Sequence, residues 1–164
     1  YTQGAMRNAT RNNYRPVNSE PMSQGTRCHQ LALYVVLDSP LNMLCDSPTA
    51  YLHEKECTEF IAAIPTVWDE TCILGGRLGE YIVTARRKGS TWYVGGITND
   101  RPYTTEIALD FLPAGRTFTM TSFEDGVNAD LQATDYRKRV REVDASTVVK
   151  VEMVRNGGWA AVIE

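Results

Sequence analysis

The sequence has little of the residue types that mark metal sites and disulfide scaffolds. It contains two histidines and four cysteines in 164 residues, and no two cysteines have the CxxC spacing of a zinc site. Four cysteines are also too few for a disulfide framework in a chain of this length. We therefore expect Cys28, Cys45, Cys57 and Cys72 to be free and buried.

Long apolar runs and an excess of one charge are also missing. Seventeen Lys and Arg stand against 20 Asp and Glu, a net charge of −3, so the composition does not favour nucleic acid or an anionic membrane as partner. No apolar stretch reaches the roughly 18 residues that a transmembrane helix needs, and the start has no signal-peptide pattern. The chain opens Tyr1-Thr2-Gln3-Gly4 without an initiator Met, so we expect it to be cut from a longer precursor.

What is present changes character near Pro65. Three of the four cysteines and both helical patterns precede this residue, whereas ten of the twelve glycines follow it. The composition therefore predicts two structures joined here, with residues 1–65 forming one part and residues 66–164 the other.

The first part is predicted to run loop, helix, strand, helix. Residues 1–22 are rich in Asn, Pro and Arg and form a polar loop. Ser23 is the expected cap of a helix with apolar positions at Cys28, Leu31, Ala32, Val35 and Val36, which ends before Pro40. Residues 41–45 predict a short buried strand, and a second helix runs from Pro48 to about Pro65.

A single strand between two helices is not a domain, because its backbone groups need partners on both edges. This stretch is therefore predicted to be the last αβα unit of an α/β barrel or an open α/β sheet. Ligand sites in such folds lie at the C-terminal ends of the strands. Asp46 follows the predicted strand directly and is our candidate substrate-facing residue, although an Asp at this position can also simply cap the next helix.

The second part alternates in the manner of β-strands. Residues 79–86 and 91–97 predict a hairpin around Lys88-Gly89-Ser90. Residues 107–111 are expected to pair with 118–120, and residues 136–143 with 146–153. Asn156-Gly157 predicts a turn before the final strand 159–163. About eight strands without helices indicate an antiparallel β-sandwich, so the expected fold class is α+β.

Several motifs in the chain have an ordinary structural explanation. The run 124–130 is acidic but lacks the EF-hand order, which favours a turn. Residues 137–141 alternate basic side chains and are expected to guard a sheet edge. The glycines of 75–79 predict a loop rather than a phosphate site. The two histidines stand apart from any catalytic constellation, and Trp68, Trp92 and Trp159 are expected in the core, with sugar stacking as the alternative.

Two regions resemble glycoside hydrolase family 97. The strings Pro65-Thr66-Val67-Trp68-Asp69-Glu70-Thr71, Gly79-Glu80-Tyr81-Ile82-Val83 and Asp125-Gly126-Val127-Asn128-Ala129-Asp130 are similar to the C-terminal region of that family. The strings Gln30-Leu31-Ala32-Leu33-Tyr34-Val35-Val36 and Ser39-Pro40-Leu41-Asn42-Met43-Leu44 are similar to the end of its catalytic barrel. The resemblance covers essentially the whole chain.

The resemblance implies an αβα remnant of a (β/α)8 barrel at 1–65 and a C-terminal β-sandwich at 66–164. It also implies an exo-acting α-galactosidase or α-glucosidase that uses two carboxyl groups and Ca²⁺, in a periplasmic or secreted location. By position, the catalytic carboxylates and calcium ligands lie before Tyr1, so no catalytic or metal residue is expected in this chain. Residues 22–27 look more like the retaining α-galactosidase branch than the inverting α-glucosidase branch.

The sequence is therefore consistent with three functions. The first is the catalytically silent C-terminal part of such an enzyme, which supports the rest of its own barrel and contributes to a homo-oligomer. The second is a carbohydrate-binding module built on the sandwich, and the third is a structural interaction domain. The expected small-molecule partner is an oligosaccharide or glycoside.

Overall fold

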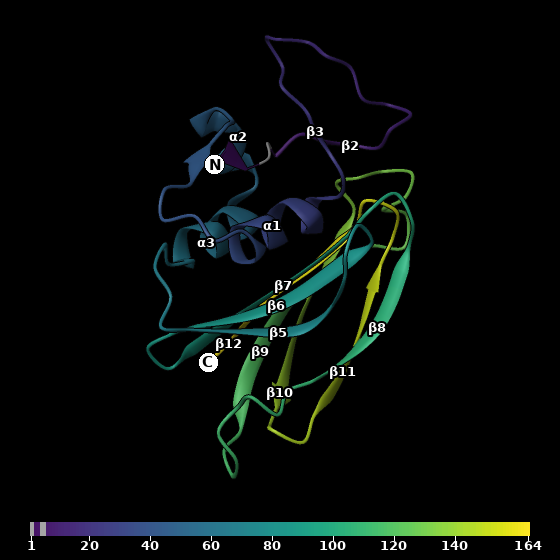
Figure 1. The fold of residues 1–164 in the computed structure, drawn as a ribbon. Helices are drawn as coiled ribbons and strands as arrows, with labels where there is room; N and C mark the ends of the chain where they lie inside the picture. The colour runs from purple at the N-terminus through teal and green to yellow at the C-terminus, as the bar shows by residue number, and fades with distance from the viewer. Residues whose placement is uncertain (1, 4–5) are drawn as a thin grey trace.

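A computed structural model describes residues 2–3 and 6–164 of the chain. Three helices, α1 (Arg27–Val36), α2 (Pro48–His53) and α3 (Lys55–Ala63), gather on one side of a large β-sheet. A two-stranded sheet covers the opposite face (Figure 1). None of the helices in the described part is long and apolar enough to cross a membrane.

The large sheet contains six antiparallel strands in the order β10-β9-β12-β7-β6-β5. Their bounds are β5 Glu70–Arg77, β6 Tyr81–Lys88, β7 Thr91–Thr98, β9 Phe118–Asp125, β10 Tyr136–Val143 and β12 Gly158–Ile163. The second sheet pairs β8 (Tyr103–Ala108) with β11 (Val148–Met153). Apolar side chains of both sheets, including the buried Trp92 and Trp159, form one core between them. The predicted antiparallel sandwich of eight strands is confirmed.

Two of the three predicted strand pairings are wrong. The β6–β7 hairpin forms as expected, with Arg87 opposite Trp92. However, β8 pairs with β11 and not with β9, and β10 pairs with β9 and not with β11. Alternating apolar residues identify a strand and its buried face but carry no information about its neighbour. Here the chain crosses between the two sheets where a local hairpin was expected.

The glycine-rich run 75–79 is also not the predicted loop. Gly75 and Gly76 continue β5 after a bulge that follows Ile73, and the turn is confined to Leu78–Glu80. Gly79 has a φ of 77°, a backbone conformation that glycine adopts without strain. Gly76 lies opposite Ile82, so it faces the same side of the sheet as the helices.

The predicted polar loop contains ordered structure. The strand β2 (Asn8–Ala9) pairs in parallel with β3 (Ser23–Gln24), and Met6, Asn8 and Ala9 are buried. Positions 1, 4 and 5 of that predicted loop lie outside the described residues. The segment between β2 and β3 projects away from the body as a loop (Figure 1).

The helix boundaries also differ from those predicted. Ser23 belongs to β3, and Thr26 is the cap of α1, where its side chain accepts a hydrogen bond from the His29 amide at 3.1 Å. The second predicted helix is two helices, which meet at Glu54 with φ −106° and ψ 47°. Pro48 starts α2 as expected.

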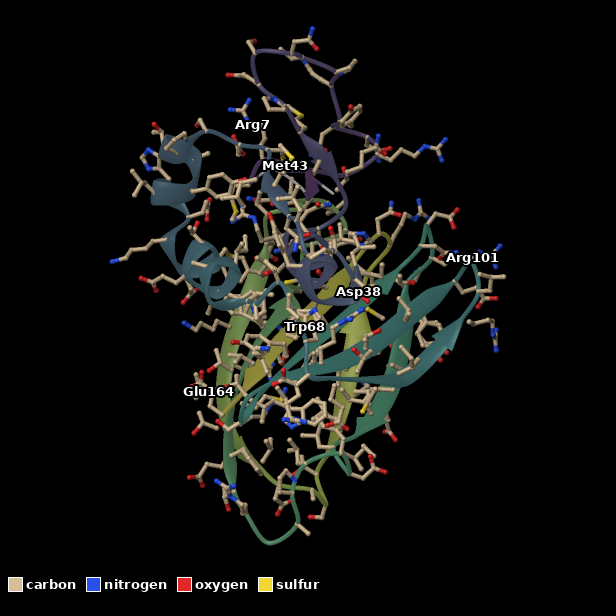
Figure 2. All side chains as sticks on the ribbon, turned by 60° about the vertical axis from the view of Figure 1, so that its left-hand side comes forward. Arg7, Asp38, Met43, Trp68, Arg101 and Glu164 are labelled. Atoms are coloured by element: carbon tan, nitrogen blue, oxygen red, sulfur yellow. The ribbon has the colours of Figure 1, made fainter. Side chains whose placement is uncertain are left out.

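The predicted strand at 41–45 is confirmed as β4 (Met43–Leu44), but it is not buried. Met43 and Leu44 are 55% and 52% exposed, and Met43 stands clear of the sandwich in Figure 2. The chain does supply one neighbour that the sequence analysis did not find, because β4 pairs in parallel with β1 (Thr2–Gln3). Along the chain β1 leads through β2 and β3 to α1, whereas β4 leads directly to α2 and α3.

Candidate functional site

Asp46 lies in the turn between β4 and α2, where its carboxylate joins two parts of the chain. One oxygen, Oδ2, accepts a hydrogen bond from the Met6 amide at 2.8 Å, and Oδ1 accepts one from the Ser47 amide at 2.9 Å. Its own amide donates to the Tyr51 hydroxyl at 3.1 Å. Asp46 is not the helix cap, because the Ser47 hydroxyl accepts the Ala50 amide in that role.

The turn forms one wall of a charged hollow of about 500 Å³. Arg7 and Glu20 form an ion pair of 2.5 Å across its outer side, where Arg7 is visible in Figure 2. Arg27 and Glu54 form its inner side, at 2.7 Å. Glu20 and Glu54 each pair with an arginine side chain, and Asp46 accepts hydrogen bonds from backbone amides. These contacts order the surrounding loops.

Arg27 is the centre of this network and the residue that the sequence analysis missed. Its side chain is only 1% exposed and donates to the Met6 carbonyl at 2.6 Å, to Glu54 and to the side chain of Asn8. Burial opposes its charge, but the hydrogen bond and charge of Glu54 outweigh that effect and raise the pKa of Arg27. Because Arg27 opens α1 and bonds to Asn8 of β2 and to Glu54 at the end of α2, its guanidinium holds these three elements together.

The hollow does not fit a calcium site. Glu20 and Glu54 pair with arginines, Asp46 accepts two amide hydrogen bonds, and the described residues include no cluster of three or more His, Cys, Asp or Glu side chains able to hold a metal ion. The acidic run 124–130 is divided between the end of β9 and an adjacent turn.

Asp125 is a second residue whose position the sequence did not reveal. The side chain is buried, and its Oδ2 accepts the amides of Val154 and Gly158, both at 3.0 Å. Burial raises the pKa of this carboxyl from its ordinary value of 3.8 to about 6. Asp125 thus links the end of β9 to the turn before β12, rather than lying in a solvent-exposed acidic turn.

The basic residues of β10 surround one carboxylate. Arg137, Arg139 and Arg141 reach Glu124 of β9 at 3.9, 3.3 and 2.8 Å, while Lys138 points to the other face and pairs with Glu56 of α3 at 3.1 Å. Because β10 is an outer strand of the six-stranded sheet, this charged cluster lies at a sheet edge, as predicted.

The tryptophans do not form a sugar-stacking platform. Trp92 and Trp159 are 3% and 1% exposed, so the core prediction is confirmed for both. Trp68 lies at the junction of the helices and the sheet, edge-on to Tyr93 with ring centroids 5.5 Å apart (Figure 2).

All four cysteines are free, as predicted, but only Cys28 and Cys57 are buried. Cys45 and Cys72 are half-exposed, because Cys45 lies in a turn and Cys72 lies on the outer strand β5.

Comparison with protein families decides the assignment. A family model described as "Glycosyl-hydrolase 97 C-terminal, oligomerisation" matches residues 67–164. The chain belongs to glycoside hydrolase family 97. The match begins two residues after Pro65 and spans every strand of the sandwich, from β5 to β12.

Relatives extend the family 97 likeness over the helical part. The chain is 54% identical over all 164 residues to a retaining alpha-galactosidase of Bacteroides thetaiotaomicron, of which it covers 25%. It is 30% identical over 133 residues to a probable retaining alpha-galactosidase of Streptomyces bingchenggensis, of which it covers 20%. The chain thus spans about a quarter or less of the length of these relatives.

Solved structures agree with the family 97 fold. A family 97 enzyme from Pseudoalteromonas sp. strain K8, in complex with acarbose, superposes with a TM-score of 0.81 at 37% identity. That alignment covers 85% of this chain and 22% of the other. A beta-arabinopyranosidase gives a TM-score of 0.72 at 28% identity over 88% of this chain and 22% of its own.

Proposed function

We propose that this chain is the C-terminal part of an exo-acting α-glycosidase of the retaining α-galactosidase type. The observation that carries the proposal is the 54% identity, over every residue of the chain, to a retaining alpha-galactosidase. The parallel pairing of β1 with β4 supports a position at the end of the barrel in such an enzyme. In this proposal residues 1–65 supply the last two strands of a (β/α)8 barrel, β1 and β4, with their helices, and residues 66–164 form the sandwich that supports them.

The chemistry belongs to the part of the enzyme that precedes Tyr1. Retaining glycosidases use one carboxylate as nucleophile and a second carboxyl group as acid and base, about 5 Å apart. In this chain the carboxylates of the charged hollow are held by Arg7, Arg27 and backbone amides, so they are poorly suited to either role. Calcium, with ligands outside this chain, would supply a positive charge near the substrate.

Asp46 is the residue of this chain that we place nearest the substrate. It stands at the C-terminal end of β4, the end at which barrel enzymes bind their substrates. Its two hydrogen bonds to amides leave lone pairs on both oxygens, which can accept bonds from sugar hydroxyls. In this role Asp46 positions the βα turn and the glycoside and takes no part in bond cleavage.

An assay of the longer enzyme and of this chain tests the proposal. The longer enzyme should hydrolyse aryl α-galactosides faster than aryl α-glucosides, and this chain alone should hydrolyse neither. Turnover by the isolated chain would refute a supporting role. A preference for α-glucosides would favour the alternative within the family, an inverting α-glucosidase.

A homo-oligomer is a second proposal, and the description of the matched family model as an oligomerisation region favours it. Sedimentation of the longer enzyme should show an assembly larger than one chain.

A carbohydrate-binding role for the sandwich is less well supported, because Trp92 and Trp159 are in its core. Absence of binding to galactose, glucose and maltooligosaccharides at millimolar concentration would exclude the carbohydrate-binding role and leave the role of supporting the barrel.

Secretion or export to the periplasm is likewise proposed from the family resemblance and is tested by cell fractionation.

A further inference from the structure

An apolar surface remains uncovered on the helical face of the large sheet. Ile73, Gly76, Leu78, Ile82 and Ile97, which we call the ledge, line a hollow of about 670 Å³. Ile73 is 63% exposed and Leu78 is fully exposed. Exposed apolar side chains gathered in this way indicate a contact surface.

The ledge continues a surface that already holds helices. On the same face, α3 packs on β9, where the rings of Phe60 and Phe123 lie 5.0 Å apart, and on β10, where the Tyr136 hydroxyl donates a hydrogen bond to Glu56. Next to α3, α1 lies on β12 and β7, where a Cβ on Gly95 would be 2.8 Å from the Ala32 carbonyl oxygen. Beyond α1 the sheet extends toward the loop that carries Arg101 (Figure 2).

The spacing of the helices leaves room for one more. Packed helices lie about 8–10 Å apart and strands about 4.8 Å apart, so neighbouring helices on a sheet are about two strands apart. The pair β9/β10 carries α3 and the pair β7/β12 carries α1, while the ledge lies on β5, β6 and the turn between them, with Ile97 of β7 at its border. Gly76 leaves the backbone of β5 bare on this face, and the three atoms nearest to a Cβ there belong to Tyr81 and Ile82, at 3.5 Å or more.

We propose that the ledge binds the barrel helix that immediately precedes β1 in the longer enzyme. This inference rests on the proposed function and specifies how the barrel and the sandwich meet. In a barrel with right-handed crossovers, the helix before a strand lies beside the helix after it. That places the helix before β1 next to α1, on the side away from α3, which is where the ledge lies. The relatives are about four times the length of this chain and so contain such a segment.

Side-chain footprinting of the longer enzyme tests the proposal without using its activity. Hydroxyl radicals should label Ile73 and Leu78 at least about fivefold less than Val127 and Leu131, which are similarly exposed in this chain at 81% and 72%. The protection should be the same at dilutions where the enzyme is monomeric and where it is associated. Labelling of Ile73 and Leu78 equal to the two controls would overturn the proposal. Protection seen only in the associated state would also overturn it and would assign the ledge to a second copy.

A matched pair of substitutions gives an independent reading. In the longer enzyme, Ile82→Asp should lower Tm by several degrees and restore labelling of Ile73, while the oligomeric state stays unchanged. The control Val148→Asp, at a 59% exposed position of β11 on the second sheet, should leave Tm and labelling nearly unchanged. Dissociation of the oligomer by Ile82→Asp would contradict a helix on the ledge and would assign the ledge to a second copy. Because glycosidase activity is not measured, failure of this test is distinct from failure of the proposed function.

Discussion

Two adjacent glycines of β7 allow a direct test of how the helical part docks on the sandwich. Gly95 faces α1, and a Cβ there would lie 2.8 Å from the Ala32 carbonyl oxygen and 2.9 Å from the Val35 Cβ. Gly96 faces the opposite side, where the nearest atoms to a Cβ are the Val83 Cγ2 at 3.4 Å and the Met153 Sδ at 3.5 Å. Both pair with the same two strands, β6 and β12.

The two Gly→Ala substitutions should therefore have different effects. At Gly95 the added methyl group forces α1 away from the sheet, and overpacking of this kind costs about 1–3 kcal/mol. At Gly96 the methyl group fits ordinary contact distances, and the stiffer unfolded chain stabilises the protein by about 0.4–1 kcal/mol. The free energies of unfolding of the two variants should thus differ by at least about 1 kcal/mol, with Gly95→Ala the less stable.

Urea unfolding, followed by tryptophan fluorescence, measures this difference. Trp92 and Trp159 are buried in the sandwich and report its unfolding. Hydrogen exchange of the α1 amides then locates the effect, since Gly95→Ala should accelerate exchange in α1 and Gly96→Ala should not. Equal stability of the two variants would refute the claim that α1 rests directly on the backbone of β7.

Three further predictions concern buried charges. Burial raises the pKa of Asp125 to about 6 in the folded state, so its contribution to stability is full below about pH 4 and is lost by about pH 6, a change of about 3 kcal/mol. Asp125→Asn should remove this component from urea midpoints measured at both ends of that range, and an unchanged pH dependence would argue against it. Arg27→Met leaves the Met6 carbonyl without its donor and should destabilise the protein by about 1–3 kcal/mol; a wild-type Tm would contradict the role of Arg27 as the link among β2, α1 and α2. Glu124→Gln leaves the arginines of β10 without their shared carboxylate and should cost about 1 kcal/mol at low salt, less in 1 M NaCl. A salt-independent difference would point to packing as the cause.

Local features of the fold were predictable from the sequence because they depend on neighbouring residues. The β6–β7 hairpin follows from alternating residues around Gly89, and Pro48 fixes the start of α2. The cap of α1 was placed at Ser23 because both Ser23 and Thr26 can fill that role. Gly25, with a φ of 105°, ends β3 and turns the chain so that the helix begins after Thr26.

Features that depend on distant residues were not predictable in the same way. The partners of β8 and β9 are set by which sheet each strand joins, and this depends on packing across the whole sandwich. Arg27 is buried because acceptors from residues 6, 8 and 54 meet around it. Asp125 is buried because the amides of residues 154 and 158 converge on it. An arginine opening an apolar helix was the one sequence signal that could have identified Arg27.

The anomeric configuration of the first product tests the central claim most directly. The longer enzyme, incubated with an aryl α-galactoside and followed by proton NMR, is expected to release α-galactose first, with the β-anomer appearing only through mutarotation. Retention of this kind requires a nucleophilic carboxylate that forms a covalent intermediate with the sugar, and we propose that this carboxylate lies in the part of the enzyme before Tyr1. Release of β-galactose first, or no turnover of α-galactosides, would contradict the assignment of this chain to a retaining α-galactosidase.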